Sequence, residues 1–184
     1  QTQPAGLYQA RIDRVNPALV CIMVDQSGSM AWPIAGSEVP KSTAVGQQLN
    51  RLIYELILRC VKTPNEAPLP YFHLSVIGYG GIDGMPNKPR ITNLIQIPPD
   101  NPFMSYSTTQ LAESPLRMDK VKDPVTDQWL QMPVWVDPKA FGGTPMCAAI
   151  DSSGAGISDW SRRYSGGFPP IVINLTDGAA TDGA

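Results

Sequence analysis

The sequence predicts an α/β fold, and three observations lead to that prediction. The run ALVCIMV at 18–24 is apolar without alternation and rich in branched side chains, which is typical of a central strand covered on both faces. A long amphipathic helical pattern follows it, and a second strand-like run, YFHLSVIGY at 71–79, comes next. Strand, long helix and strand in succession indicate a βαβ unit or a β-α-antiparallel-β start.

Composition limits the kind of protein and the partners it can have. The chain has 184 residues, of which 42% are hydrophobic, enough for one globular domain with its own core. Its formal charge is −2 and no basic stripe stands out, which argues against nucleic acid or an anionic membrane as a partner. No apolar run approaches the ~18 residues of a membrane span.

The first helix is expected over 41–62, ending before Pro64. Apolar residues recur at three- and four-residue steps along one stripe: Val45, Leu49, Leu52, Ile53, Leu56, Ile57 and Cys60. The opposite face is expected to hold Gln47, Asn50, Arg51 and Glu55. Such a stripe predicts a helix packed on the sheet by one side.

The segment 81–140 contains nine prolines and no long helical stripe. A strand is expected at 91–97 and a short extended piece at 132–138, with ordered loop or hairpin elsewhere. Trp129 and Trp135 are expected to form local core. A connection this long is unusual within a compact domain, so we interpret it as an insertion with a possible binding role.

A second helix begins in FGGTPMCAAI, with Thr144 placed as its cap and Pro145 at its first position. Its expected buried face comprises Met146, Ala149, Ile150, Ser153, Ile157 and Trp160. The run PIVINLTDG at 170–178 is a third apolar strand, which ends at Asp177.

Oxygen-bearing side chains gather where these elements meet. Asp25, Ser27 and Ser29 follow the first strand, Asp177 follows the last, and Thr144 opens the second helix. Loops at the carboxyl ends of neighbouring parallel strands crowd together at one edge of a sheet, where ligands bind. The five side chains are therefore expected to converge.

A set that offers only oxygen fits a hard divalent cation. Mg²⁺, Mn²⁺ and Ca²⁺ prefer oxygen ligands, whereas zinc usually takes His or Cys. Two carboxylates neutralise one divalent ion. Mg²⁺ takes about six ligands, so five protein groups leave room for a ligand from another molecule, such as a carboxylate.

DQSGS, the Thr of GGTP and the Asp of LTDG resemble the metal-ion-dependent adhesion site of the von Willebrand factor A (integrin I-like) family. The resemblance implies a Rossmann-like three-layer sandwich with a mostly parallel central sheet, formed by residues 1–184 as one domain. It implies that Ser27, Ser29 and Thr144 coordinate Mg²⁺, or Mn²⁺ or Ca²⁺, and that Asp25 and Asp177 do so directly or through water. It also implies a protein partner that offers an Asp or Glu carboxylate to the metal.

The sequence departs from the family pattern in two places. The proline-rich insertion at about 81–140 is longer than a compact member needs. The family continues past the TDG strand with further strands and helices, so the domain is expected to be incomplete after that strand. We therefore predict that the strand at Ile171–Leu175 forms an open edge. A second copy of the chain or another protein could cover that edge.

The predicted function is a metal-dependent protein–protein interaction module and not an enzyme. A scaffold subunit of an ATPase-associated intracellular complex is an alternative with the same site. A Mg²⁺-dependent phosphoryl-transfer enzyme is a second alternative. Ser27 stands where the haloacid dehalogenase-like group needs a second carboxylate, and no lysine is clearly placed to stabilise a phosphoryl group.

Other catalytic and redox signals are weak. His73 is the only histidine, lies within a strand and is expected to be structural. G-x-S-x-G and phosphate-loop motifs are absent from the sequence. Cys21, Cys60 and Cys147 are odd in number and widely spaced, and are interpreted as small buried side chains. Few cysteines favour a reducing compartment, so we expect a cytoplasmic location.

Overall fold

The computed structural model describes residues 10–82, 85–95, 103–123 and 125–183. Its central sheet has five strands: β1 (Ala18–Gln26), β2 (Phe72–Ile82), β3 (Met85–Asn93), β4 (Tyr106–Ser107) and β7 (Ile171–Leu175). The order is β3-β2-β1-β7, and β4 pairs with the start of β2. Strand β1 is parallel to β2 and β7, whereas β3 and β4 run antiparallel to β2. The predicted α/β class with a mostly parallel central sheet is confirmed.

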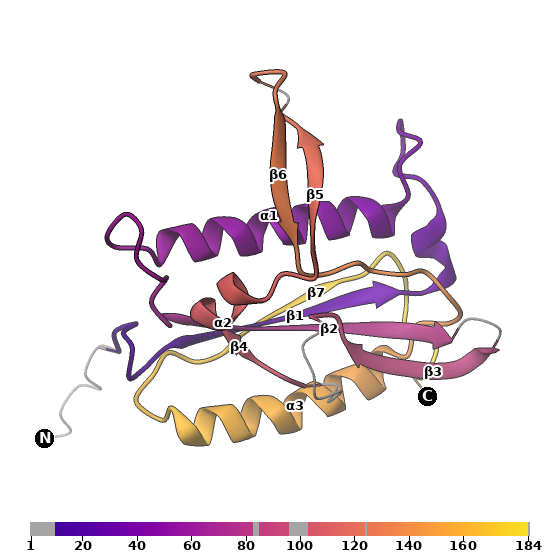
Figure 1. Ribbon diagram of the computed structural model, residues 1–184. Coiled ribbons are helices and arrows are strands. Elements are labelled where there is room, and N and C mark those ends of the chain that lie inside the picture. Colours follow the sequence, from indigo (N-terminus) through magenta and orange to yellow (C-terminus); the bar gives the residue numbers. More distant parts are fainter. Residues whose placement is uncertain (1–9, 83–84, 96–102, 124, 184) are drawn as a thin grey trace, which may run out of the picture.

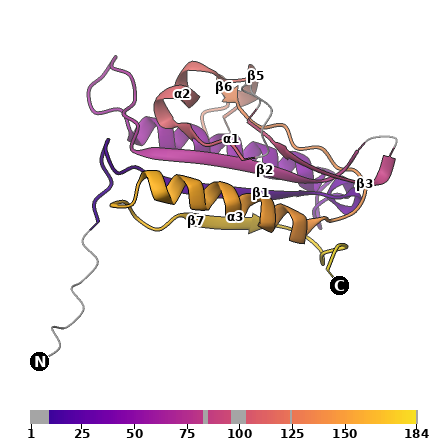
Figure 2. The same cartoon turned by 90° about the horizontal axis from the view of Figure 1, so that it is seen from below.

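Two long helices cover the sheet from opposite sides. Helix α1 (Lys41–Arg59) lies on one face and α3 (Met146–Arg163) on the other (Figures 1 and 2). Strand β1 contributes side chains to the hydrophobic core on each face of the sheet, because alternate side chains of a strand point to opposite faces. Ile22 and Val24 pack in the core that contains α1 residues, while Cys21 and Met23 pack in the core that contains Ala149 of α3. Burial on both faces explains why the β1 sequence is apolar without alternation.

Helix α1 begins at the predicted residue, but its buried face is rotated from the predicted stripe. Leu49, Ile53 and Ile57 are buried as expected, whereas Leu52 is 46% exposed and Asn50 only 8% exposed. The assignment of Asn50 to the solvent face was therefore wrong. Its amide donates to the carbonyls of Gly46 and Val136, both at 2.8 Å, and accepts the backbone N–H groups of Trp135 and Val136. These four hydrogen bonds satisfy every donor and acceptor of the side-chain amide, so they offset the free-energy cost of burying it.

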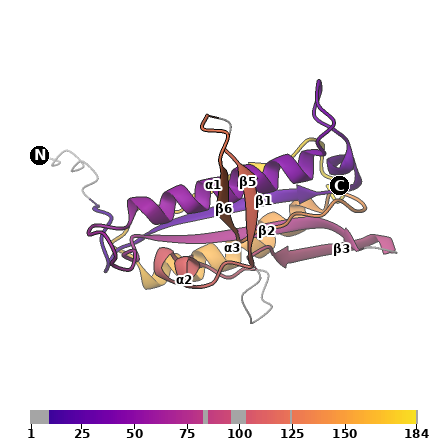
Figure 3. The ribbon, with the colours of Figure 1, turned by 45° about the horizontal axis from the view of Figure 1, so that its top comes forward.

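The insertion contains a short helix and a projecting hairpin. Beyond β3 and β4 it forms α2 (Thr108–Glu113), β5 (Arg117–Lys122) and β6 (Trp129–Val134). Figure 3 shows the β5–β6 hairpin standing across α1, away from the central sheet. Strand β3 overlaps the strand expected at 91–97 only up to Asn93, and residues 96–97 lie outside the described residues. Trp135 is buried as predicted, but Trp129 is 67% exposed, so its assignment to a local core was wrong.

Strand β7 is an edge strand, as predicted. Among the described residues it pairs with β1 alone. Three successive apolar side chains are partly open to solvent: Ile171 at 53%, Val172 at 50% and Ile173 at 39%. Strand β7 therefore presents unpaired backbone groups and apolar side chains together.

Two smaller predictions have mixed outcomes. Cys21 and Cys60 are buried free thiols as expected, but Cys147 is exposed near the start of α3, so its burial was wrongly predicted. Ile150 was expected on the buried face of α3 and is 51% exposed. Within the described parts of the chain, no helix is both long enough and apolar enough to span a membrane.

Candidate functional site

Asp25 occupies the carboxyl end of β1, opposite Tyr79 of the neighbouring parallel strand β2. Its side chain is fully buried, with 0% exposure. One carboxylate oxygen accepts the Ser27 backbone N–H at 2.7 Å, and the other accepts the Thr176 hydroxyl at 2.8 Å. Both of these donors are neutral. A buried carboxylate with neutral partners is costly unless a cation lies close to it.

Three further oxygens form a chain next to Asp25. The hydroxyl oxygens of Ser27 and Ser29 lie 3.0 Å apart, and the Ser29 hydroxyl donates to Asp177 Oδ1 at 2.8 Å. A short 3-10 turn at Gly28–Ala31 follows the strand and brings the two serine side chains to the same side. The structure thus brings together Asp25, Ser27, Ser29 and Asp177, from segments about 150 residues apart in sequence.

The loop that carries Thr144 contacts this group through Gly142. The Gly28 N–H donates to the Gly142 carbonyl at 2.9 Å, which joins the serine turn to the loop that precedes α3. Gly142 has a φ of 69°, a left-handed conformation that favours glycine. Thr144 is 6% exposed, and its backbone N–H donates to the Thr181 hydroxyl at 2.9 Å. In the described residues its hydroxyl makes no hydrogen bond to the other four predicted side chains.

The start of α3 differs from the prediction. The helix begins at Met146, Pro145 is the residue before it, and the side chain of neither Thr144 nor Pro145 caps it. Asp182 does so from 35 residues away, accepting the backbone N–H groups of Cys147 at 3.0 Å and Ala148 at 2.9 Å. These hydrogen bonds lower the pKa of Asp182 below its ordinary value. A carboxylate is a better partner than a threonine for the positive end of the helix.

Lys41 is a site residue that the sequence analysis missed. Its ammonium nitrogen lies 2.6 Å from Asp177 Oδ2, and the two side chains are 30% and 15% exposed. The hydrogen bond from Lys41, supported by that from Ser29, lowers the pKa of Asp177 below its ordinary value. The sequence analysis found no lysine clearly placed to stabilise a phosphoryl group, and the structure places Lys41 beside Asp177. Lys41 is 136 residues from Asp177 in sequence, and no local pattern links them.

Thr176 was also missed as a contributor to the site, and Asp182 was missed as the cap of α3. Thr176 lies next to Asp177 within the LTDG motif that the sequence analysis used, so the strand end itself could have indicated it. Thr181 and Asp182 belong to a second TDG sequence at 181–183. Their hydrogen bonds to Thr144 and to the start of α3 depend on how the chain folds back onto that helix. A contact of that kind leaves no periodic signal in the sequence.

The residues present fit a hard cation. Two ligands on adjacent positions of an octahedral Mg²⁺ shell, each about 2.1 Å from the ion, lie about 3 Å apart. The oxygen pairs Ser27–Ser29 and Ser29–Asp177 are separated by 3.0 and 2.8 Å, which is compatible with that spacing and is also the length of the hydrogen bonds they make. No cluster of three or more His, Cys, Asp or Glu suited to a metal occurs in the described residues. The predicted set differs in kind, because it has two carboxylates and three hydroxyls.

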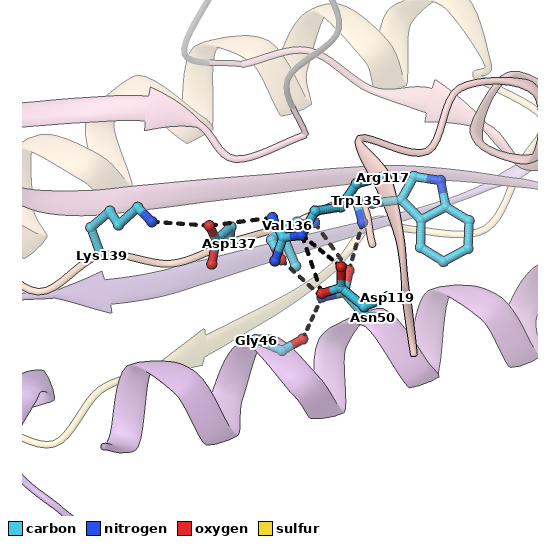
Figure 4. Close-up of polar contacts among 8 residues, drawn as sticks. All are labelled: Gly46, Asn50, Arg117, Asp119, Trp135, Val136, Asp137 and Lys139. Carbon is cyan, nitrogen blue, oxygen red and sulfur yellow. Dashed lines mark hydrogen bonds and ion pairs between the residues drawn. The ribbon is translucent and has the colours of Figure 1, made fainter. Parts of the chain in front are cut away.

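A second polar cluster lies away from this site, between α1 and the β5–β6 hairpin. Figure 4 shows Arg117 paired with Asp119 and Asp137, and Asp137 paired in turn with Lys139. The cluster borders a groove of about 460 Å³. Its ion pairs are largely exposed, and such pairs contribute little to stability. The cluster balances its own charges and does not point to one ligand.

Comparison of the chain with protein-family profiles, with curated proteins and with solved structures found no significant match.

Proposed function

We propose that this chain is a metal-dependent protein-binding module of the von Willebrand factor A type, with a Rossmann-like three-layer architecture. The observation that supports it most is the fully buried carboxylate of Asp25, held by neutral donors beside the oxygens of Ser27, Ser29 and Asp177. A bound divalent cation offsets the cost of burying that charge. An all-oxygen donor set favours Mg²⁺ or Mn²⁺, with Ca²⁺ as a weaker fit.

Each residue has a distinct part in this proposal. Ser27, Ser29 and Thr144 offer neutral oxygens, while Asp25 and Asp177 supply the two charges that balance a divalent ion. When bound, the ion supplies an electrophilic position that a carboxylate from another protein can occupy. The Ser29 hydroxyl donates to Asp177, but that carboxylate is paired with Lys41, which makes it a weak base. For this reason we propose a binding function and not an enzymatic one.

The surface beside the site indicates what the partner presents around its carboxylate. The loop between the serine turn and α1 exposes Trp32 at 66%, Ile34 at 44% and Val39 at 40%. Trp32 is adjacent to the site, since its N–H donates to the Ser29 carbonyl at 3.0 Å and its carbonyl accepts from Lys41 N–H at 2.9 Å. Exposed apolar side chains next to a charged centre are typical of interaction surfaces. The partner is expected to present an acidic residue flanked by apolar ones.

Metal binding is tested by calorimetric titration with Mg²⁺ and Mn²⁺. The wild-type chain is expected to bind one ion, Asp25→Ala to bind none, and Ser29→Ala to bind more weakly. Asp151→Ala removes an exposed carboxylate of α3 and is the matched control, expected to behave as wild type. Equal metal binding by wild type and Asp25→Ala would refute the proposed site.

Partner chemistry is tested by selecting displayed random peptides in Mg²⁺ and eluting them with EDTA. The selected peptides are expected to share an Asp or Glu, and its replacement by Asn or Gln should abolish binding. Trp32→Ala is expected to weaken peptide binding without changing metal affinity. Trp129→Ala is the matched control, because that side chain is 67% exposed on the distant hairpin. Selected peptides without a common acidic residue would contradict the proposal.

Phosphoryl transfer is a second candidate, and one observation favours it. Lys41 places a cation at the site, which could stabilise a phosphoryl group. However, Lys41 is engaged by Asp177, and Asp25 is fully buried with both oxygens hydrogen-bonded, a poor arrangement for a nucleophile. Hydrolysis of p-nitrophenyl phosphate that is lost in Asp25→Asn would favour this candidate over the binding module.

A further inference from the structure

Lys41 lies at the N-terminus of α1, where a positive charge is unfavourable without a negative partner. It is the first residue of α1, and the preceding Pro40 provides no side-chain cap. The N-terminus of a helix carries about half a positive charge, so a lysine there is electrostatically unfavourable. The ammonium group avoids this by extending to Asp177 Oδ2 at 2.6 Å. It also lies 6.0 Å from the centre of the Trp32 ring, which helps to hold it beside the site.

The pair leaves Asp177 with both oxygens engaged. Oδ1 accepts the Ser29 hydroxyl at 2.8 Å, and Oδ2 accepts Lys41. A divalent ion that binds Asp177 directly at Oδ2 competes with the ammonium for that oxygen. An ion that binds Asp177 through water still experiences a positive charge a few ångströms away. In either arrangement the presence of Lys41 opposes metal binding.

From this contact we propose that Lys41 is a built-in competing cation. It neutralises Asp177 while the site holds no metal, stabilises that state and lowers the affinity for the divalent ion. The inference rests on the proposed function, because it concerns the same metal site. It adds a regulatory property: the affinity for the ion is lower than the oxygen ligands alone would give.

Lys41→Met tests the inference, since methionine keeps much of the apolar stem and removes the charge. Calorimetric titration with Mg²⁺ and Mn²⁺ is expected to show binding about two- to fivefold tighter than wild type, the range for a partly exposed ion pair. In EDTA, the melting temperature of Lys41→Met is expected to fall by about 2–4 °C. With saturating Mg²⁺ that difference should shrink or reverse.

Two controls separate the local effect from general electrostatics. Lys62→Met removes an equal charge just beyond the far end of α1, where Lys62 stacks on Tyr71, and is expected to leave metal affinity unchanged. Lys41→Arg keeps the charge and is expected to bind metal within about twofold of wild type. Lys41→Gln repeats the test with a polar neutral side chain, in case the methionine variant folds poorly.

The outcomes distinguish the inference from the proposed function. If wild type binds metal and neither Lys41→Met nor Lys41→Gln binds it more tightly, the inference is overturned and the proposed function stands. If wild type binds no divalent ion, both are overturned. Tighter binding in both neutral Lys41 variants, with Lys62→Met unchanged, supports the inference.

Discussion

At the scale of single residues, Asn50 joins the insertion to the rest of the molecule. Its side chain makes four hydrogen bonds, one within α1 and three to the backbone of Trp135 and Val136 (Figure 4). Trp135 in turn donates its ring N–H to the Leu111 carbonyl at 2.7 Å. A buried amide of this kind specifies geometry, because each of its groups is costly to leave unpaired.

We expect Asn50→Ala to destabilise the chain by about 2–4 kcal/mol. The substitution leaves the N–H groups of Trp135 and Val136 buried without their present acceptor, which costs more than the lost hydrogen bonds alone. Urea unfolding measures the change. Gln47→Ala, on the exposed side of the same helix, is the control and should lie within about 0.5 kcal/mol of wild type. A loss below about 1 kcal/mol for Asn50→Ala would show that water replaces the amide.

His73 makes stability depend on pH. Its Nδ1 accepts the Trp160 ring N–H at 2.9 Å, which requires the neutral imidazole, and burial lowers its pKa below the ordinary value of 6.5. The positive charge of Arg163 acts in the same direction. Because the unfolded chain binds a proton more readily, the free energy of unfolding is expected to be constant above about pH 7 and to fall as the pH drops below 6.5.

Chemical unfolding at a series of pH values between about 5 and 7.5 measures this slope, within the range where histidine titrates. His73 is the only histidine, so His73→Gln should remove most of the slope in that window. A slope that persists in His73→Gln must come from another group and would contradict the assignment.

At the scale of elements, two glycines in helices have opposite roles. Gly46 in α1 faces the insertion, and a Cβ built there would lie 2.8 Å from Cδ of Pro138. Gly154 in α3 has no atom within 4 Å of such a Cβ. The first glycine is needed for close packing, whereas the second only weakens its helix.

Gly46→Ala is therefore expected to destabilise the chain by about 1–2 kcal/mol, because the strain of overpacking exceeds the gain in helix propensity. Gly154→Ala should stabilise it by about 0.5–1 kcal/mol. Thermal unfolding of both variants, measured side by side, provides the comparison. If Gly46→Ala proves as stable as Gly154→Ala, the Pro138 segment can move away and does not restrain α1.

Helices with one apolar face and strands with continuous apolar runs could be predicted from the sequence. The exposed β5–β6 hairpin could not. Strands β1 and β2 and helices α1 and α3 bury apolar residues with a clear period or as continuous runs, and β7 is a continuous apolar run although most of its side chains are exposed. The β5–β6 hairpin is exposed along most of its length, so burial imposes no alternation that would reveal it. Its Trp129 was taken for core because a large apolar side chain was assumed to be buried.

The same physical distinction applies to the candidate site. Asp25, Ser27, Ser29 and Asp177 could be brought together in advance because strand ends of a parallel sheet share one edge. Lys41 reaches the site, and Asp182 reaches the start of α3, through long-range contacts that depend on side-chain length and on the path of a loop. Nothing in their local sequence distinguishes them from surface charges.

At the scale of the whole molecule, the open edge at β7 is the feature with the largest consequence. The backbone of β7 pairs on one side only, and its first three side chains are between 39% and 53% exposed. Natural edge strands are usually protected by charge, proline or a covering element. Strand β7 contains neither a charged residue nor a proline within Ile171–Leu175.

The chain of residues 1–184 is therefore expected to self-associate as its concentration rises, through pairing or packing at β7. Sedimentation velocity over a wide concentration range measures this association. Val172→Lys places a charge at the middle of the exposed run and should shift the chain toward monomer, because burying the ammonium in a contact is costly. Val125→Lys adds the same charge to a residue that is 90% exposed near the hairpin turn, and should leave association unchanged. A wild-type chain that stays monomeric over the whole concentration range would contradict this prediction. It would mean that the β7 edge is stable while exposed to solvent.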